Sequence, residues 1–198
     1  MKLLLHTCCG PCASATIPMW QGRGAEVTGF FFNPNVHPLL EWRRRLTGAE
    51  DVVAQTGIEL VADPAYDPAQ WFATVVSPVA ASAAGSPGEG SRCRRCIGQR
   101  LMRAAAEAAA RGCDAFSTSL SISPWQDHDA ICEGGAEAAA AHDVEFLYED
   151  LRPLYGESRR LSREWGLYRQ KYCGCLISEW ERYREPPATT PAAGRGGR

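Results

Sequence analysis

Short apolar runs alternate with longer stretches of helical periodicity along most of the chain. The first run is Leu3-Leu4-Leu5, and turn-forming residues bound the runs, as is typical of buried strands. We expect strands at 2–6, 26–32, 58–61, 114–118 and 144–147. The polar and apolar periodicity predicts helices at about 11–21, 39–55, 70–76, 92–111, 127–141 and 157–170.

Strands that alternate with helices predict a parallel sheet covered on both faces. We therefore expect an α/β fold with a doubly wound, largely parallel sheet of the Rossmann-like or HUP-like three-layer type. Polar segments follow three of the predicted strands: Cys8-Cys9, residues 33–38 and residues 119–126. Because the carboxyl ends of parallel strands share one edge, these segments should line one crevice, with the cysteines at 93–96 and 173–175 folded over it.

The composition indicates an ordinary globular chain. With 198 residues, 45% of them hydrophobic, it can bury one sizeable core. We predict a single domain over residues 1–184 and a disordered tail over 185–198. No apolar run is long enough for a signal peptide or a membrane span, so we expect a cytoplasmic protein. Thiols stay reduced in that compartment, so the nine cysteines favour metal binding or redox chemistry over a disulfide framework.

Charge is distributed unevenly along the chain. The net charge is only −2, but arginines are clustered at 43–45, 92–103 and 159–163. Residues 127–150 contain acids and neither Lys nor Arg. The arginine runs are suited to neutralising the phosphates of a nucleic acid, and they are equally typical of a solvated helix face.

The cysteines that can carry chemistry form three groups. These are Cys8, Cys9 and Cys12, the C-x-x-C of Cys93 and Cys96, and the C-x-C of Cys173 and Cys175. Two sulfurs from the adjacent pair and two from the C-x-x-C make a set that suits an iron-sulfur cluster or zinc. Consecutive cysteines fit the wider iron-sulfur cubane better than a small tetrahedral zinc site. The sequence therefore favours iron.

The C-x-C is suited to storing electrons. A disulfide across Gly174 would be strained and easily reduced, and a dithiol carries two electrons where a cubane passes one at a time. The alternative is that Cys173 and Cys175 merely flank the start of a helix. Cys12 stays open: it can ligate the cluster in place of a neighbour, hold an additional iron, or pack in the first helical turn. The remaining cysteines, Cys113 and Cys132, each stand alone and are interpreted as structural.

Two other functional classes have to be weighed. Cys9-Gly10-Pro11-Cys12 is also the active-site tetrapeptide of thioredoxins, but here it follows the first strand, and Cys8 takes the place usually held by Trp. A thiol-disulfide oxidoreductase using Cys9 and Cys12 would hold no iron, and a zinc-stabilised RNA-binding module would show no redox chemistry. Neither class explains the C-x-C. Nucleotide-hydrolysis motifs are absent from the sequence, so nothing supports the use of ATP.

Five motifs follow one another along about residues 2–184. They are His6-Thr7-Cys8-Cys9-Gly10-Pro11-Cys12, residues 31–38 with Glu41 and Arg44, Arg92-Cys93 with Cys96, residues 119–126 with His128, and residues 167–175. In these motifs the sequence resembles the QueH-type epoxyqueuosine reductases. Trp42 and Trp125 stand where Tyr is frequent in the family, and Ile97 replaces an aromatic residue. The key cysteines are all kept.

The resemblance implies both cofactor and reaction. Cys8, Cys9, Cys93 and Cys96 would bind a 4Fe-4S cluster, and Cys173 and Cys175 would form a redox-active disulfide. The substrate would be tRNA with epoxyqueuosine at the wobble position of the anticodon, which is deoxygenated to queuosine with electrons from an unidentified donor.

The same resemblance leaves several roles as expectations. Candidate proton donors or orienting groups are His37, Asp127, His128, Asp129 and Tyr172. Trp125 or Tyr172 is available to stack on an unstacked base, and the arginine runs would contact phosphates.

Overall fold

The computed structural model describes residues 1–63, 66–77 and 89–184, and the tail predicted at 185–198 lies outside these ranges. One five-stranded sheet has the order β3-β2-β1-β4-β5, and every neighbouring pair is parallel. The strands are β1 (Lys2–His6), β2 (Glu26–Phe31), β3 (Glu59–Ala62), β4 (Ala115–Thr118) and β5 (Glu145–Phe146). The predicted doubly wound, parallel α/β sheet is confirmed.

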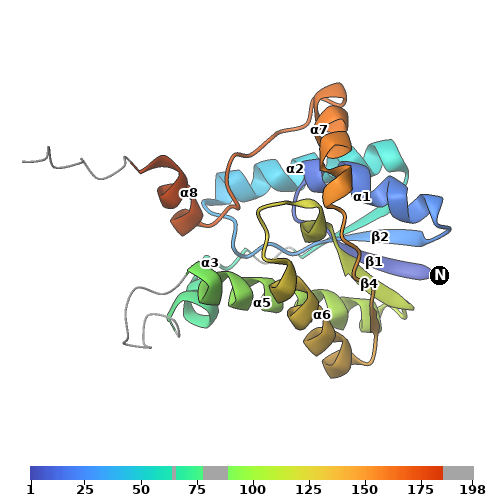
Figure 1. Ribbon diagram of the computed structural model, residues 1–198, viewed down its shortest axis with the longest axis horizontal. Helices are drawn as coiled ribbons and strands as arrows, with labels where there is room; N and C mark the ends of the chain where they lie inside the picture. The colour runs from blue at the N-terminus through green and yellow to red at the C-terminus, as the bar shows by residue number, and fades with distance from the viewer. Residues whose placement is uncertain (64–65, 78–88, 185–198) are drawn as a thin grey trace, which may run out of the picture.

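Helices cover both faces of the sheet (Figure 1). One face carries α1 (Gly10–Gly22), α2 (Leu39–Thr56) and α7 (Tyr155–Glu164), and the other carries α5 (Glu89–Ala110) and α6 (His128–His142). The shorter elements are α3 (Pro68–Trp71), the π-helical turn η1 (Phe72–Val76), the 3-10 turns η2 (Ser119–Ile122) and η3 (Arg152–Leu154), and α8 (Leu176–Tyr183). The fold therefore has three layers, with α8 beyond the carboxyl ends of the strands (Figure 1).

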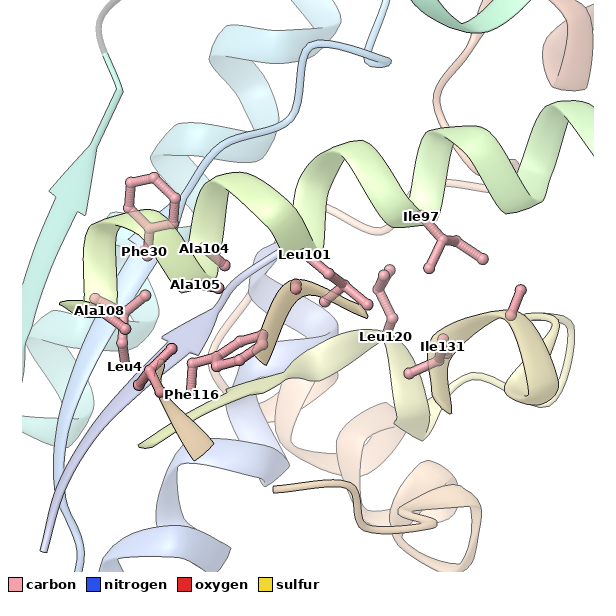
Figure 2. Close-up of a cluster of buried hydrophobic side chains, with 13 residues drawn as sticks. Leu4, Phe30, Ile97, Leu101, Ala104, Ala105, Ala108, Phe116, Leu120 and Ile131 are labelled. Atoms are coloured by element: carbon pink, nitrogen blue, oxygen red, sulfur yellow. The ribbon is translucent and has the colours of Figure 1, made fainter. Parts of the chain in front are cut away.

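Alternating side chains of β1 supply the two halves of the core. Leu4 packs with Phe116 and Leu101 in the cluster beneath α5 and α6, which Figure 2 shows. Leu3 and Leu5 point to the opposite face and pack against α1 and α2. Successive strand residues face opposite sides of a sheet, so a fully buried run of leucines is what a central strand requires.

The strand order places a ligand crevice between β1 and β4. The chain winds from β1 toward β3 in one direction and from β1 toward β5 in the other, so the ends of β1 and β4 flank the switch point. Cys8 follows β1 there, and its backbone N–H donates to Ser119 Oγ, which follows β4, at 3.1 Å. The expected convergence of the cysteine-bearing loop and the 119–126 loop is confirmed.

The C-terminal part of the domain differs from the prediction. The helix expected over 157–170 ends at Glu164, because Gly166 adopts a left-handed φ of +63° that stops the helix. The prediction of helix as far as residue 170 was wrong. The helix α8 was not predicted, and the Cys175 thiol caps it by accepting a hydrogen bond from Ser178 N–H.

Gly10 is required by the close approach of α1 to α2. A Cβ at Gly10 would overlap the carbonyl oxygen of Gly48 and lie 2.7 Å from its carbonyl carbon. We expect Gly10→Ala to lower the free energy of unfolding by about 1–3 kcal/mol, because the helix backbones must move apart. Urea unfolding measures the change, and Gly22→Ala on the same helix, where a Cβ meets nothing within 4 Å, is the control. Equal stability of Gly10→Ala and the parent protein would contradict the packing.

Candidate active site

Three thiols meet where β1 ends and α1 begins. Cys8 follows the strand, Cys9 is the residue before α1, and Cys12 lies in the first turn of that helix. Their sulfur atoms all lie within 4.8 Å of one another. We call these residues the cysteine trio. The structure thus places the Cys12 sulfur close to those of Cys8 and Cys9, although the sequence left the role of Cys12 open.

The donor set of the trio suits a thiophilic metal. A tetrahedral ion with metal–sulfur bonds of about 2.3 Å holds its sulfurs about 3.8 Å apart. Cys8 Sγ and Cys9 Sγ are 3.7 Å apart. The trio therefore fits thiolate-bound iron or zinc with little movement.

Hydrogen bonding within the trio concentrates negative charge on one sulfur. Hydrogen bonds from Cys12 and from Cys8 lower the pKa of the Cys9 thiol, and nearby Arg45 lowers it further. Hydrogen bonding to Cys8 and Cys9, together with burial, raises the pKa of Cys12. Gln170 Nε2 also donates to Cys9 Sγ at 2.9 Å. Cys9 is therefore the thiol that ionises first.

His6 fixes the strand end that carries the trio. Its buried ring lies with Nδ1 2.9 Å from Thr118 Oγ1 and Nε2 3.2 Å from the Phe32 carbonyl oxygen. Burial and the charge of Arg100 lower its pKa to about 3, so the ring is neutral at physiological pH. The Nε2–H then donates to Phe32, and the Thr118 hydroxyl donates to Nδ1. His6 thus joins the end of β1 to β4 and to the end of β2.

The C-x-x-C cysteines lie on α5, one turn apart, and face the same side of the helix. Cys96 is buried and accepts a hydrogen bond from Trp71 Nε1 at 3.4 Å. Burial raises its pKa to about 11. Burial also raises the pKa of Cys93. Cys96 belongs to the same buried cluster as Cys175, so the C-x-x-C and the C-x-C lie close together.

The two C-x-C thiols have different surroundings. Cys173 is exposed and lines the crevice, where Gln126 Nε2 donates to its sulfur at 3.7 Å. Cys175 is buried, and its sulfur accepts from Ser178 N–H at 3.3 Å. Both are free thiols, so this C-x-C is in its dithiol form.

One buried arginine connects the three cysteine groups electrostatically. Burial opposes the charge on Arg100, yet its pKa is raised, because Cys96, Cys173, Cys8 and Cys93 all lie near enough to stabilise that charge. The side chain is only 2% exposed. A cation in this position offsets the negative charge that several thiolates would bring together.

Two of the three cysteine groups line a crevice of about 750 Å³, through Cys8 and Cys12 of the trio and Cys173 of the C-x-C. Cys93 and Cys96, which the sequence analysis expected to fold over it, are not among the described residues that line it. Its lining includes the basic side chains of Arg45, Arg100, Arg159, Arg169, Lys171 and Arg182, the trio members Cys8 and Cys12, and the aromatic rings of Trp125, Tyr155 and Tyr172. Among the described residues that line it, Glu181 is the single acid. Trp125 is 76% exposed and packs its ring against the ring of Tyr155. The crevice is therefore basic, with an aromatic pair at its rim.

The candidate proton donors occupy different places. Tyr172 lines the crevice, and burial raises its pKa to about 12. His37 is buried against the rings of Trp71 and Phe72, outside the crevice lining. The other three belong to the start of α6 and lie outside that lining: Asp127 caps the helix, His128 bonds Ser123 O and Tyr148, and Asp129 follows in the first turn.

Many of the clustered arginines have acidic partners. Arg92 pairs with Glu181, Arg94 with Asp127 and Glu133, Arg103 with Asp63 and Glu107, and Arg160 with Glu157 and Glu164. Only Arg45, Arg100 and Arg159 of the predicted runs line the crevice, alongside basic residues from other segments. The basic character of the site therefore comes from selected side chains and not from whole runs.

Comparison with known families shows which protein family contains this arrangement of cysteines. The family model described as "Epoxyqueuosine reductase QueH" matches residues 3–181, which span the trio, the C-x-x-C and the C-x-C. The chain belongs to the QueH family. The resemblance noted from the motifs is thereby confirmed.

Individual relatives agree with the family match. A protein named epoxyqueuosine reductase QueH from Dehalococcoides mccartyi is 42% identical over 187 residues, covering 93% of this chain and 96% of that protein. The QueH protein of Thermotoga maritima is 36% identical over 184 residues, covering 91% of each chain. The QueH protein of Acinetobacter baylyi is 34% identical over 180 residues, covering 89% of this chain and 80% of its own.

Solved structures support the fold alone. A predicted subunit of tRNA methyltransferase from Methanocaldococcus jannaschii superposes with a TM-score of 0.50 at 12% identity, covering 84% of this chain and 89% of that one. Within the described part of the QueH chain, no helix has the length and apolar character needed to cross a bilayer.

Sequence reasoning missed two residues at the centre of this QueH site. It singled out Glu41 and Arg44, but the buried partner of Glu41 is Arg45, whose Nε lies 2.8 Å from Glu41 Oε1. The i, i+4 spacing of Glu41 and Arg45 was the available signal, since residues four apart share a helix face. Gln170, which contacts Cys9, carried no signal beyond its place in a family motif.

Proposed function

We propose that this chain reduces epoxyqueuosine to queuosine at the wobble position of tRNA, in the cytoplasm. The observation that carries the proposal is the gathering of three cysteine groups around Arg100, beside a basic crevice, in a chain of the QueH family. Neither a thioredoxin-like oxidoreductase nor a zinc-stabilised RNA-binding module accounts for all three groups together.

The reaction needs two electrons and two protons. The epoxide loses its oxygen as water, and a carbon–carbon double bond forms in its place. Oxidation of the Cys173 and Cys175 dithiol to a disulfide releases two electrons and two protons, so the exchange balances. An external electron donor must then reduce the disulfide before the next turnover.

The close approach of Cys8, Cys9 and Cys12 supports a metal centre at the trio. In this proposal Cys8, Cys9, Cys93 and Cys96 hold a 4Fe-4S cluster, and Cys12 is placed to hold an additional iron. When bound, the cluster supplies one-electron transfers. The protein contributes a buried cation at Arg100 that offsets thiolate charge, and a neutral His6 that fixes the strand end beneath Cys8.

Metal analysis separates the competing functions. After anaerobic purification, we expect about four irons or more and about four acid-labile sulfides per chain, with a visible absorption that dithionite bleaches. Zinc without sulfide would support the binding module. A metal-free protein that reduces disulfides would support the thioredoxin-like class.

Side chains of the crevice are suited to the nucleic acid and to the protons. Arg159, Arg169 and Lys171 can contact phosphates on either side of the reacting nucleotide. Tyr172 keeps its phenolic proton at neutral pH, because burial raises its pKa to about 12, and it therefore can donate a hydrogen bond to the epoxide oxygen.

Trp125 is positioned to stack on a base of the anticodon loop. We expect Trp125→Ala to weaken binding of an anticodon stem-loop about tenfold, the typical loss when one base–aromatic stack is removed. We also expect the affinity of the parent protein to fall steeply with salt, because its phosphate contacts release counterions. Fluorescence anisotropy over a salt series measures both effects. Trp180→Ala, an exposed tryptophan outside the crevice lining, is the matched control. Salt-insensitive binding, or unchanged affinity of Trp125→Ala, would contradict this role.

A further inference from the structure

The C-x-C segment is held in place by side chains far away in sequence. Arg45 Nη1 donates to the Cys173 carbonyl oxygen at 2.6 Å, and Arg45 Nη2 donates to the Tyr172 carbonyl oxygen at 3.2 Å. The guanidinium also lies 5.4 Å from the centroid of the Tyr172 ring. Residues 167–175 form no helix or strand, so these bonds replace the ones that secondary structure would supply.

Arg45 is itself rigidly held. Its Nε lies 2.8 Å from Glu41 Oε1, and the two side chains are 3% and 6% exposed. The Tyr168 hydroxyl donates to the other carboxylate oxygen of Glu41 at 2.7 Å. A buried ion pair in which every group is bonded keeps one geometry, and losing one partner leaves an uncompensated buried charge. The planar fork of arginine presents separate N–H groups to Glu41 and to two carbonyls, a geometry that the compact ammonium of lysine does not reproduce.

The next residues of the segment are fixed from the same side. His37 N–H donates to the Gly174 carbonyl oxygen at 2.9 Å, and Leu176 N–H donates to His37 Nδ1 at 3.4 Å. Gly174 has a φ of +131°, and a Cβ there would lie 2.9 Å from Arg45 Nη1. The backbone from 172 to 176 thus lies directly against Arg45 and His37.

Arg45 also lies between the cysteine trio and the C-x-C. Burial opposes its charge, but Cys9, Glu41 and Cys173 together raise its pKa above the usual value. The conformation it holds gives the two C-x-C sulfurs separate partners, Gln126 for Cys173 and Ser178 N–H for Cys175. Closing a disulfide requires the sulfurs to leave these partners and meet.

We propose that Arg45 is a positioning residue that holds the C-x-C in its dithiol conformation beside the cysteine trio. The inference rests on the proposed redox role of Cys173 and Cys175. The hydrogen bonds of Arg45 to this segment go to carbonyl oxygens and not to the C-x-C sulfurs, so Arg45 acts through the backbone of the segment. With Arg45 in place, the Cys173 thiol faces the crevice and the dithiol resists oxidation until substrate accepts its electrons.

The test is the thiol–disulfide equilibrium of the C-x-C. The full-length protein with its metal centre is equilibrated anaerobically in glutathione redox buffers, quenched in acid, alkylated and analysed by mass spectrometry for the peptide with Cys173 and Cys175. We expect Arg45→Lys to raise the equilibrium constant for disulfide formation at least about tenfold, because charge-assisted hydrogen bonds to two carbonyls are lost. Arg43→Lys, exposed on the same helix, leaves this constant unchanged.

A milder variant keeps the test decisive if Arg45→Lys fails to fold. Tyr168→Phe removes only the hydroxyl that holds Glu41, and we expect a smaller shift in the same direction. An unchanged equilibrium in both variants, in a protein whose parent reduces epoxyqueuosine, overturns the positioning role and leaves the proposed function standing. A shift in a protein that never reduces epoxyqueuosine supports Arg45 and overturns the proposed function. A parent chain that forms no Cys173–Cys175 disulfide overturns both the inference and the redox role of the C-x-C.

Discussion

We expect the replacement of Cys93 with serine to remove bound iron and turnover together. Cys93 belongs to the four-sulfur set that we propose holds the cluster, and a serine hydroxyl, which stays protonated at neutral pH, does not replace a thiolate as a ligand to iron. We expect iron and acid-labile sulfide to fall well below the parent values and queuosine formation to drop to the background without enzyme. Iron and sulfide analysis, the visible spectrum and nucleoside mass spectrometry measure the three quantities.

Cys132→Ser is the control for this prediction. Cys132 lies in α6, where its thiol is beside Tyr148, and it belongs to none of the three cysteine groups, so its variant should keep both iron and turnover. A Cys93→Ser protein that keeps the parent content of iron and sulfide would contradict the assignment of Cys93 to the metal centre. A variant that is free of iron and fully active would contradict the role of that centre in turnover.

Replacing Cys173 with serine separates the two redox components. Cys173 is exposed in the crevice and stands outside the four-cysteine set that we propose holds the cluster, so we expect the variant to retain its iron and sulfide. Turnover should fall to background, since no dithiol remains to release two electrons and two protons. Cys175→Ser and the Cys173→Ser/Cys175→Ser double variant should lose as much turnover as Cys173→Ser and no more. The effects of replacing groups that act as a unit are not additive.

Cys113→Ser serves as the control here, because Cys113 packs beside the core cluster beneath α5. If Cys173→Ser turns over at the parent rate with a chemical one-electron donor, the dithiol only relays electrons and takes no direct part in reducing the substrate.

Local patterns were enough to predict the edge of the sheet where the site lies. Cys8 and Ser119 each follow a buried strand, and parallel strands present their carboxyl ends together, so their proximity follows from topology. The Cys9 and Cys12 spacing also places both sulfurs at one end of α1. These features depend on the spacing of apolar and polar residues within single strands and helices, which can be read from short stretches of sequence.

Tertiary contacts determine which arginines are buried or paired, which the sequence patterns could not predict. The burial of Arg45 depends on Glu41, Tyr168 and a segment more than a hundred residues away, so nothing nearby distinguishes Arg45 from Arg44 except its spacing from Glu41. The pairing of Arg92 with Glu181 likewise depends on α8, a helix that the sequence analysis did not predict. For this reason the basic lining of the crevice differs from the arginine runs.

The assignment of Cys8, Cys9, Cys93 and Cys96 to a cluster, and of Cys173 and Cys175 to a disulfide, stays a prediction. Physical proximity supports it: the trio is within 4.8 Å, Cys96 packs with Cys175, and Arg100 lies near all three groups. The same proximity places Cys12 beside Cys8 and Cys9, the two proposed ligands in the trio, which the sequence spacing alone left undecided.

Conversion of epoxyqueuosine in tRNA tests the central claim most directly. The protein, purified anaerobically with its iron, is incubated with dithionite and with tRNA that carries epoxyqueuosine, and the digested nucleosides are separated and weighed by mass spectrometry. We expect epoxyqueuosine to disappear and queuosine, lighter by one oxygen atom, to appear in equal amount. Intact epoxyqueuosine after prolonged incubation with protein that carries its full iron and sulfide would contradict the account.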